Sequence, residues 1–385
     1  MLGEVKVWFW LFYSPSLLLT LILVYIIGFT VMLIGAGYIA PRVARRVTRR
    51  LSLQASMAIL GLIVILSGIA GVGIVAYVLL GVLEVEMTAG FIISILILVL
   101  ILNMLSYLLS PFMINTMFRA KSDPALQRVV DEVAATLGFS KPPKAVVVEG
   151  LPNAFAYGNI LAGRYVAISR SLMAITTPDE LKAVIGHELG HHKHRDNAIM
   201  LFMGLIPSVL YFLGVTLVRL GIISGYARSL SSRRREGGGG LVLILAGVVA
   251  IVVSFIVQIL VLAFSRLREY YADSTGAYAT SPRAMQRALA RLHVYYTGAP
   301  RAREEVAGSK LKALFIYALT ETYANPFYRY SPVVDPRSVD IDRVIEDLKR
   351  SETEDILEFF STHPPIPKRI RFLDTLYYTQ IPILR

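Results

Sequence analysis

Long uninterrupted runs of apolar residues dominate the first third of the chain. Three of them cover residues 17–40, 57–83 and 91–113. Each is longer than the roughly 20 residues that an α-helix needs to cross a bilayer. Buried helices of soluble proteins rarely lack charge over such lengths. The pattern therefore predicts three transmembrane helices within residues 1–118.

Two further apolar runs, at residues 198–223 and 241–264, lie in the middle of the chain. Both are long enough to cross a bilayer. The segment between them is rich in arginine, which opposes crossing because basic loops normally stay on the cytoplasmic side. Two interpretations remain open. Length and apolarity favour a membrane hairpin over residues 198–264, and the alternative is a pair of helices packed near the membrane surface.

Residues 119–197 show a different pattern of short, mixed elements. An amphipathic stretch from Asp123 to near Gly138 predicts a helix. Two β-branched runs, at 145–148 and 164–168, predict strands. The residues between these runs, 153–158, are small and turn-rich, as in a loop or an irregular edge strand. We expect a small sheet that packs against helices, in a protein that is mainly α-helical.

One helix in this part carries a polar pair on one face. Thr177 and Glu180 form a capping pattern at its start, and apolar residues then recur at helical spacing. His187 and His191 are four residues apart, so both imidazoles can reach one metal ion. Glu188 directly follows the first histidine. This His-Glu-x-x-His pattern supplies two zinc ligands and a general base for a zinc-bound water.

A second polar pair with the same spacing follows the last apolar run. Glu269 and Asp273 face the same way on a helix. A site with two histidines needs a third protein ligand, and a ligating histidine usually donates its other N–H to a carboxylate. Glu269 fits the first role and Asp273 the second. A solvated helix face would explain the same spacing about as well.

Composition and charge narrow the possible zinc ligands and the possible partners of the basic residues. Hydrophobic residues make up 55% of the 385 residues, and there is no cysteine, so a zinc site has to use histidine and carboxylate ligands. The net charge is +12, but the early arginines, at residues 42–50, flank apolar runs. They therefore indicate an anionic membrane surface rather than nucleic acid. The positive-inside rule places them, and residues 119–197, in the cytosol.

Taken together, the motifs resemble the HtpX family of membrane zinc metalloproteases, which are relatives of the CAAX prenyl proteases. The matching segments occur in the family's order and spread over most of the polar part of the chain. They are residues 153–158, 187–191, Asp196, 269–273 and 361–370. The resemblance implies that Glu269 is the third zinc ligand and that Asp273 is the hydrogen-bonding partner of a ligand.

The resemblance also implies roles for residues without a clear signal of their own. It implies an active-site role for His363, which near zinc could stabilise the oxyanion of the tetrahedral intermediate. Asp196 is expected to orient the end of the zinc helix or a neighbour of the ligands. The residues expected to bind substrate are Asn153, Ala154, Phe155, Ala156 and Arg369.

The fold implied is an integral membrane protein, mainly α, with a cytosolic zincin-like α+β catalytic domain split into residues 119–197 and 265–385. The function implied is a zinc endopeptidase, with one Zn²⁺ per chain, that cleaves misfolded or damaged membrane proteins at the cytosolic face of the plasma membrane. One alternative is a specific processing protease of the prenyl-peptide type. Another is a catalytically silent zinc scaffold, which the presence of Glu188 disfavours because a structural site needs no base. The sequence indicates no oligomeric state.

Overall fold

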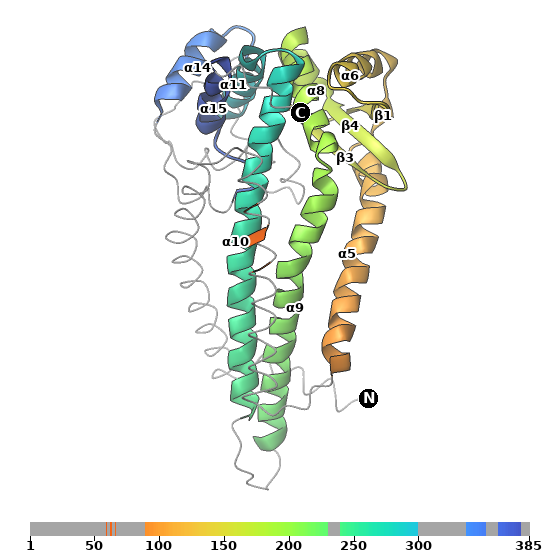
Figure 1. The fold of residues 1–385 in the computed structure, drawn as a ribbon, viewed down its shortest axis with the longest axis vertical. Coiled ribbons are helices and arrows are strands. Elements are labelled where there is room, and N and C mark those ends of the chain that lie inside the picture. The colour runs from red at the N-terminus through yellow and green to blue at the C-terminus, as the bar shows by residue number, and fades with distance from the viewer. Residues whose placement is uncertain are drawn as a thin grey trace. The chain divides into compact units, whose positions relative to one another are not determined.

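The computed structural model describes residues 89–229, 239–298, 336–351 and 361–378, together with four helical positions between residues 59 and 66. Helices predominate among these residues, with one four-stranded mixed sheet (Figure 1). The predicted helix at 17–40, most of the predicted helix at 57–83 and the arginines at 42–50 lie outside the described residues. The chain divides into two compact units, which are described in turn.

Each apolar run in the described part of the chain belongs to a long helix. The runs at 91–113, 198–223 and 241–264 lie in α5 (Ala89–Met117), α9 (Asp196–Ser229) and α10 (Gly239–Ala279). Among the described residues, Ile199–Ser224 and Leu243–Ala279 are long and apolar enough to cross a membrane, by length and composition alone. The predicted predominance of helices, with apolar helices among them, is confirmed. Membrane crossing remains a prediction.

Within the first unit, α9 and α10 pack closely at glycines. A Cβ atom on Gly214 would lie 2.7 Å from the carbonyl oxygen of Gly247, and one on Gly247 would lie 2.6 Å from the carbonyl oxygen of Gly214. A Cβ atom on Gly221 would meet the carbonyl oxygen of Gly240 at 2.5 Å. Backbones approach this closely only where side chains are absent, which is typical of helix contacts in membranes. Both interpretations of residues 198–264 remain open, because a close pair of helices is compatible with each.

The second unit contains the sheet. Strands β2 (Lys144–Val148) and β4 (Gly163–Ser169) are parallel neighbours and correspond to the two predicted strands. The turn-rich segment forms β3 (Ala154–Asn159), which pairs antiparallel with β4 and lies at one edge of the sheet. A two-residue strand, β1 (Lys121–Ser122), forms the other edge and was not predicted. The sequence allowed either a loop or an irregular edge strand at residues 153–158, and the structure shows an edge strand.

Both faces of the sheet are covered, which explains why its central strands are apolar rather than alternating. On one face Val147, Val166 and Ile168 join the main core of the unit, together with buried residues from the helices around it. On the other face Phe155 and Tyr157 pack with Ile114 near the end of α5. The sheet therefore connects the end of α5 to the main core.

The main core is built from short helices around α8 (Pro178–Lys193), the predicted helix with the histidine pair. The predicted helix that starts at Asp123 is α6, with the Asp123 side chain accepting hydrogen bonds from the backbone at its start. The remaining helices of this unit are α7 (Arg170–Ile175), α11 (Pro282–Gly298), α14 (Ile341–Arg350) and α15 (Ile366–Tyr378).

Asn159 fastens the turn between β3 and β4 to α5. Pro111 has no backbone N–H, so the carbonyl of Tyr107, one helical turn earlier, lacks its normal intrahelical donor. The Asn159 Nδ2 atom donates to this carbonyl at 2.8 Å and to that of Leu108 at 2.9 Å. A backbone acceptor exposed by proline thereby becomes the attachment point for the sheet edge.

The glycine contact predicts a position-specific effect on stability. We expect Gly247→Ala to lower the free energy of unfolding by about 1–3 kcal/mol, because the added methyl group meets backbone atoms of α9 that cannot move aside. Thermal unfolding in detergent measures the change. Gly204→Ala on α9 is the matched control, since a Cβ atom there meets nothing within 4 Å. Equal unfolding midpoints for the two variants would contradict the close packing.

Candidate metal centre

The start of α8 is fixed by the predicted capping residues. Thr177 accepts from the backbone of Glu180, whose carboxylate accepts in return from the Thr177 backbone at 2.9 Å. The same carboxylate is buried and pairs with Arg291 of α11. The cap satisfies backbone donors at the helix start, and the ion pair ties that start to the core. The following turns of α8 are therefore held in one position.

Glycines bring α8 against α10. A Cβ atom on Gly186 would lie 2.6 Å from the Cβ atom of Ala279, and one on Gly190 would lie 3.1 Å from the Cα atom of Ala272. On the opposite helix, a Cβ atom on Gly276 would meet the carbonyl oxygen of Ala183 at 2.6 Å. These three glycines let the two backbones touch. A glutamate on α10 can then reach the histidines on α8.

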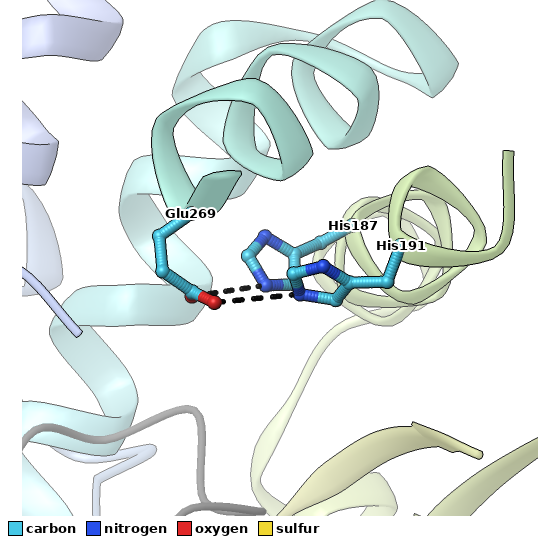
Figure 2. Close-up of side chains that lie close together, drawn as sticks. All are labelled: His187, His191 and Glu269. Atoms are coloured by element: carbon cyan, nitrogen blue, oxygen red, sulfur yellow. Dashed lines mark ion pairs between the residues drawn. The ribbon is translucent and has the colours of Figure 1, made fainter. Parts of the chain in front are cut away.

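Three side chains converge at this contact (Figure 2). The Nε2 atoms of His187 and His191 each lie 3.6 Å from one carboxylate oxygen of Glu269. The candidate ligand atoms all lie within 4.8 Å of one another, and this is the candidate metal cluster found among the described residues. Distances of 3.6 Å are too long for hydrogen bonds, yet they match ligand atoms placed about 2 Å from a shared tetrahedral ion. The residues present fit a metal ion.

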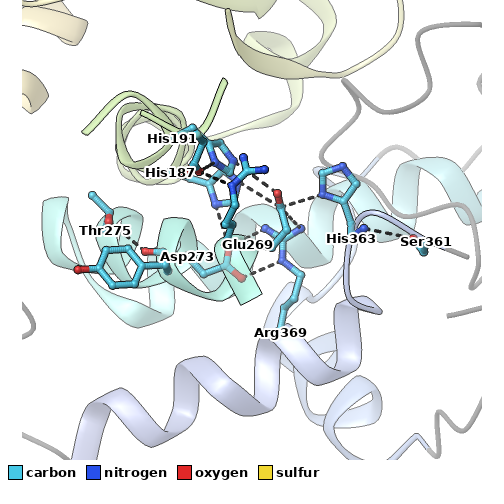
Figure 3. Close-up of polar contacts among 11 residues, drawn as sticks. His187, His191, Glu269, Asp273, Thr275, Ser361, His363 and Arg369 are labelled. Atoms are coloured by element: carbon cyan, nitrogen blue, oxygen red, sulfur yellow. Dashed lines mark hydrogen bonds and ion pairs between the residues drawn. The ribbon is translucent and has the colours of Figure 1, made fainter. Parts of the chain in front are cut away.

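The other ring nitrogen of each histidine faces a carboxylate. His187 Nδ1 lies 2.9 Å from Asp273, and His191 Nδ1 lies 2.6 Å from Asp196. A carboxylate beside Nδ1 favours the tautomer that carries its proton there and leaves the Nε2 lone pair facing the candidate metal position. Arg369 donates two hydrogen bonds to Asp273, at 2.8 and 2.6 Å (Figure 3). An unpaired buried aspartate is thereby avoided.

Asp196 forms an ion pair with a second arginine, since Arg268 Nε lies 3.0 Å from its carboxylate. Burial would raise the pKa of Asp196, but its hydrogen bond with His191 and the charge of Arg268 hold that pKa below its usual range. Burial would lower the pKa of His191, but the Asp196 hydrogen bond and the Glu269 charge raise it. Asp196 therefore stays ionised beside the candidate ligand.

His363 lies beside the third candidate ligand. Its Nδ1 atom is 2.8 Å from Glu269, on the oxygen that also faces His187 (Figure 3). The segment that carries His363 is tied to α10, because Arg266 donates to the carbonyl of Ser361 at 3.0 Å. The structure thus brings His363 to the centre, in contact with the Glu269 carboxylate.

Glu188 lies between the histidines and the edge of the sheet. Its carboxylate is buried and accepts a hydrogen bond from the backbone N–H of Ala156 on β3. Burial raises the pKa of Glu188 above its usual range, although the neighbouring histidines oppose the shift. Among the residues expected to bind substrate, Asn153, Ala154 and Phe155 are buried in or next to the same strand.

Arg369, the remaining residue expected to bind substrate, lies in different surroundings. Its side chain is 0% exposed, its guanidinium donates to Asp273, and its Nη1 atom lies 3.9 Å from Glu269. A cation buried this deeply needs a carboxylate partner, because leaving it unpaired in a low-dielectric interior costs several kcal/mol, on the order of 3–5. The structure therefore places Arg369 behind the candidate ligands.

Sequence reasoning missed Arg268 and the glycines of the helix contact. Arg268 stands directly before Glu269, and Gly186 and Gly190 flank the first histidine and its neighbours. Glycine at four-residue spacing on a helix face is the signal that could have indicated a close helix contact. His192, on the same helix, is not among the predicted site residues. It binds the carbonyl of Tyr165 at 2.8 Å, and burial lowers its pKa to about 4.

Two histidines and a glutamate around one point, with a second glutamate alongside, define the class of metal-dependent hydrolases. A family profile described as Peptidase family M48 matches residues 120–377. The chain belongs to this family and is by family a peptidase. The resemblance to HtpX proteins is also confirmed by close relatives.

The relatives carry the name Protease HtpX homolog. The chain is 50% identical to one from Pyrobaculum islandicum over 352 residues, covering 91% of this chain and 96% of that protein. It is 46% identical to one from Archaeoglobus fulgidus over 355 residues, covering 91% and 95%. The crystal structure of S. mikatae Ste24p matches with a TM-score of 0.49 and 17% identity, over 78% of this chain and 62% of that chain.

The buried arginine leads to a test of how the candidate ligands are held. We expect Arg369→Met to lower the free energy of unfolding by about 3–5 kcal/mol and to weaken metal binding, because the buried Asp273 loses its cationic partner and keeps only the His187 ring beside it. Chemical unfolding and metal titration measure the two effects. Arg343→Met, at an exposed position of α14, is the control. A variant as stable as this control would contradict the role of the ion pair.

Proposed function

We propose that this chain is a membrane-bound zinc endopeptidase that cleaves misfolded or damaged membrane proteins at the cytosolic face of the plasma membrane. One observation carries the proposal. The Nε2 atoms of two buried helix-borne histidines face both oxygens of one glutamate, with Glu188 and an edge strand directly alongside. A metal, a base and a place for an extended peptide are the three parts that metal-dependent peptide hydrolysis needs.

We assign the metal as zinc, held by His187, His191 and Glu269. Imidazole nitrogens with one carboxylate are a donor set of catalytic zinc, which keeps a further position for water or substrate. When bound, zinc polarises the scissile carbonyl and lowers the pKa of its water. Asp273 and Asp196 keep the two imidazoles oriented, and Arg369 and Arg268 keep those carboxylates ionised.

Glu188 is assigned as the general base. Its buried carboxylate has a raised pKa, which suits a group that takes a proton from water and then gives it to the leaving amine. The Ala156 N–H holds the carboxylate in place before the reaction. His363, next to Glu269, is assigned to the charge that develops on the substrate oxygen in the tetrahedral intermediate.

The edge of β3 is assigned as the binding site for the substrate backbone. Asn153 accepts from the backbone of Ser169 on β4, so alternate residues of β3 pair inward. The backbone groups of Ala154, Ala156 and Gly158 consequently face the edge that is open among the described residues, where the Ala156 N–H donates to Glu188. An extended peptide can pair there as an added strand, which places its backbone beside Glu188. Arg369 then acts on the ligands' partner rather than on substrate.

The location rests on the apolar helices and on charge. The helices that carry Ile199–Ser224 and Leu243–Ala279 have the length and composition of membrane spans, and the arginines at 42–50 favour the cytosolic side for the polar part. In this arrangement residues 1–118 and 198–264 form the membrane part, and residues 119–197 and 265–385 form the catalytic domain. Membrane proteins with exposed cytosolic segments are then the substrates within reach.

Replacing the base tests the chemistry. We expect Glu188→Gln to keep about one zinc per chain and to lose roughly 10²–10⁴-fold in the cleavage of casein, because the amide takes no proton from water. Zinc content and cleavage are measured side by side on detergent-purified protein. Glu132→Gln, on the exposed face of α6, is the control. Normal turnover in Glu188→Gln would sink the assignment of the base.

Removing a ligand tests the metal site independently of activity. His187→Ala is expected to lower the zinc content well below that of the unsubstituted chain, because two of three protein ligands remain. Metal analysis after dialysis against a weak chelator gives the readout. His293→Ala on α11 removes a histidine outside the cluster and should retain zinc. Unchanged zinc in the His187 variant would rule out this ligand set.

A further inference from the structure

The turn between β3 and β4 exposes two large apolar side chains. Ile160 is 82% exposed and Leu161 is 70% exposed, while the strands on either side are largely buried. The turn has a defined shape, because the Asn159 side chain accepts from the backbone of Leu161 at 2.9 Å and of Ala162 at 2.8 Å. Exposing apolar side chains to water is unfavourable, so two of them held at the tip of a defined turn indicate an apolar partner.

The position of this tip on α5 is fixed by hydrogen bonds. Asn159 binds the carbonyls of Tyr107 and Leu108, and the Tyr157 hydroxyl binds the side chain of Asn115. Helix α5 contains no charged residue over its whole length. From Leu108 to the end of α5 at Met117 the axis rises by about 14 Å, so the tip lies well inside the apolar length of the helix.

The surface of α5 near the tip is apolar as well. Several of its large side chains in the described residues are exposed at about half of their area or more, as expected of a surface that faces lipid rather than water. These are Leu105, Leu109, Phe112, Met113 and Met117. The hairpin tip therefore continues an apolar surface instead of standing alone.

Basic residues surround the base of the hairpin. A cavity of about 710 Å³ beside the turn is lined by Lys141, Lys144, Arg164 and Arg195, and it also reaches His191. Within the described part of the chain, none of these four cations pairs with a carboxylate. Cations that flank an exposed apolar tip are the arrangement with which proteins bind anionic headgroups while apolar side chains enter the acyl region.

We propose that the β3–β4 turn is inserted into the cytosolic leaflet of the bilayer, with Ile160 and Leu161 in the apolar region and the four cations at the headgroups. This inference rests on the proposed membrane location of α5. Its consequence is that the substrate-binding edge begins at the bilayer. A polypeptide segment that leaves the membrane meets Gly158 first and Ala156 next, beside Glu188, within about 13 Å of strand.

A single fluorescent label tests the insertion without relying on activity. The chain has no cysteine, so Ile160→Cys accepts one thiol-reactive nitrobenzoxadiazole probe. We expect this probe, in the full chain reconstituted into vesicles with anionic lipid, to be quenched by spin-labelled lipid and protected from aqueous iodide. Ala135→Cys, exposed on α6, should show the opposite pattern, and Phe112→Cys on α5 should resemble Ile160→Cys.

The outcomes separate this inference from the proposed function. If the probe at residue 160 is as accessible to iodide as the one at residue 135, the hairpin is not inserted, whatever the enzyme cleaves. If the probe is in lipid but neither casein nor a membrane protein is cleaved, the hairpin inference stands and the proposed function fails.

Activity gives a second readout. We expect Leu161→Asp to reduce cleavage of a single-span protein with an unfolded cytosolic tail by about tenfold in the same vesicles, and to change casein cleavage in detergent by less than about twofold. Ala135→Asp is the matched control for an added charge. An unchanged rate on the single-span protein, or an equal loss on both substrates, would overturn the role of the hairpin at the bilayer.

Discussion

The contact between α8 and α10 is the constraint on which the candidate site depends. The three glycines Gly186, Gly190 and Gly276 remove the side chains that would keep the helices apart. Only at this separation does a glutamate on one helix face both imidazoles on the other. The rest of the centre supports that geometry. Buried carboxylates orient the imidazoles, and buried arginines hold the carboxylates. Each group at the helix contact is therefore fixed by a neighbour that lies deeper in the core.

The sheet supplies what the helices cannot. Helices satisfy their own backbone groups, whereas an edge strand presents unpaired N–H and C=O groups in a row. Among the described residues, strand β3 offers such a row next to Glu188, apart from the Ala156 N–H, which Glu188 itself accepts, and its far end is tied to α5 through Asn159. The proposed function thus assigns hydrolysis and peptide binding to different elements. Their relative position is set where Ala156 donates its hydrogen bond to Glu188.

The sequence predicted the local elements and the chemical motifs well, because both depend on residues that are only a few positions apart. The cap at Thr177, the His187 and His191 pair and the two central strands all follow from neighbours within a few residues. It left open what depends on distant residues. Nothing local distinguishes Glu269 as a ligand from a solvated residue. The place of Arg369 is decided by Asp273, which is 96 residues away.

The buried ionisable groups of the site include more carboxylates than guanidiniums. Four buried carboxylates surround the two histidines, namely Glu188, Asp196, Glu269 and Asp273, and two guanidiniums, of Arg268 and Arg369, touch them. With neutral imidazoles and all four carboxylates ionised, this group would carry two negative charges in excess. In the proposed function, a divalent cation bound there neutralises that excess, whereas without the metal bound protons would have to do so. Loading the metal and releasing protons are therefore one coupled equilibrium, and acidification and chelation act on the same site.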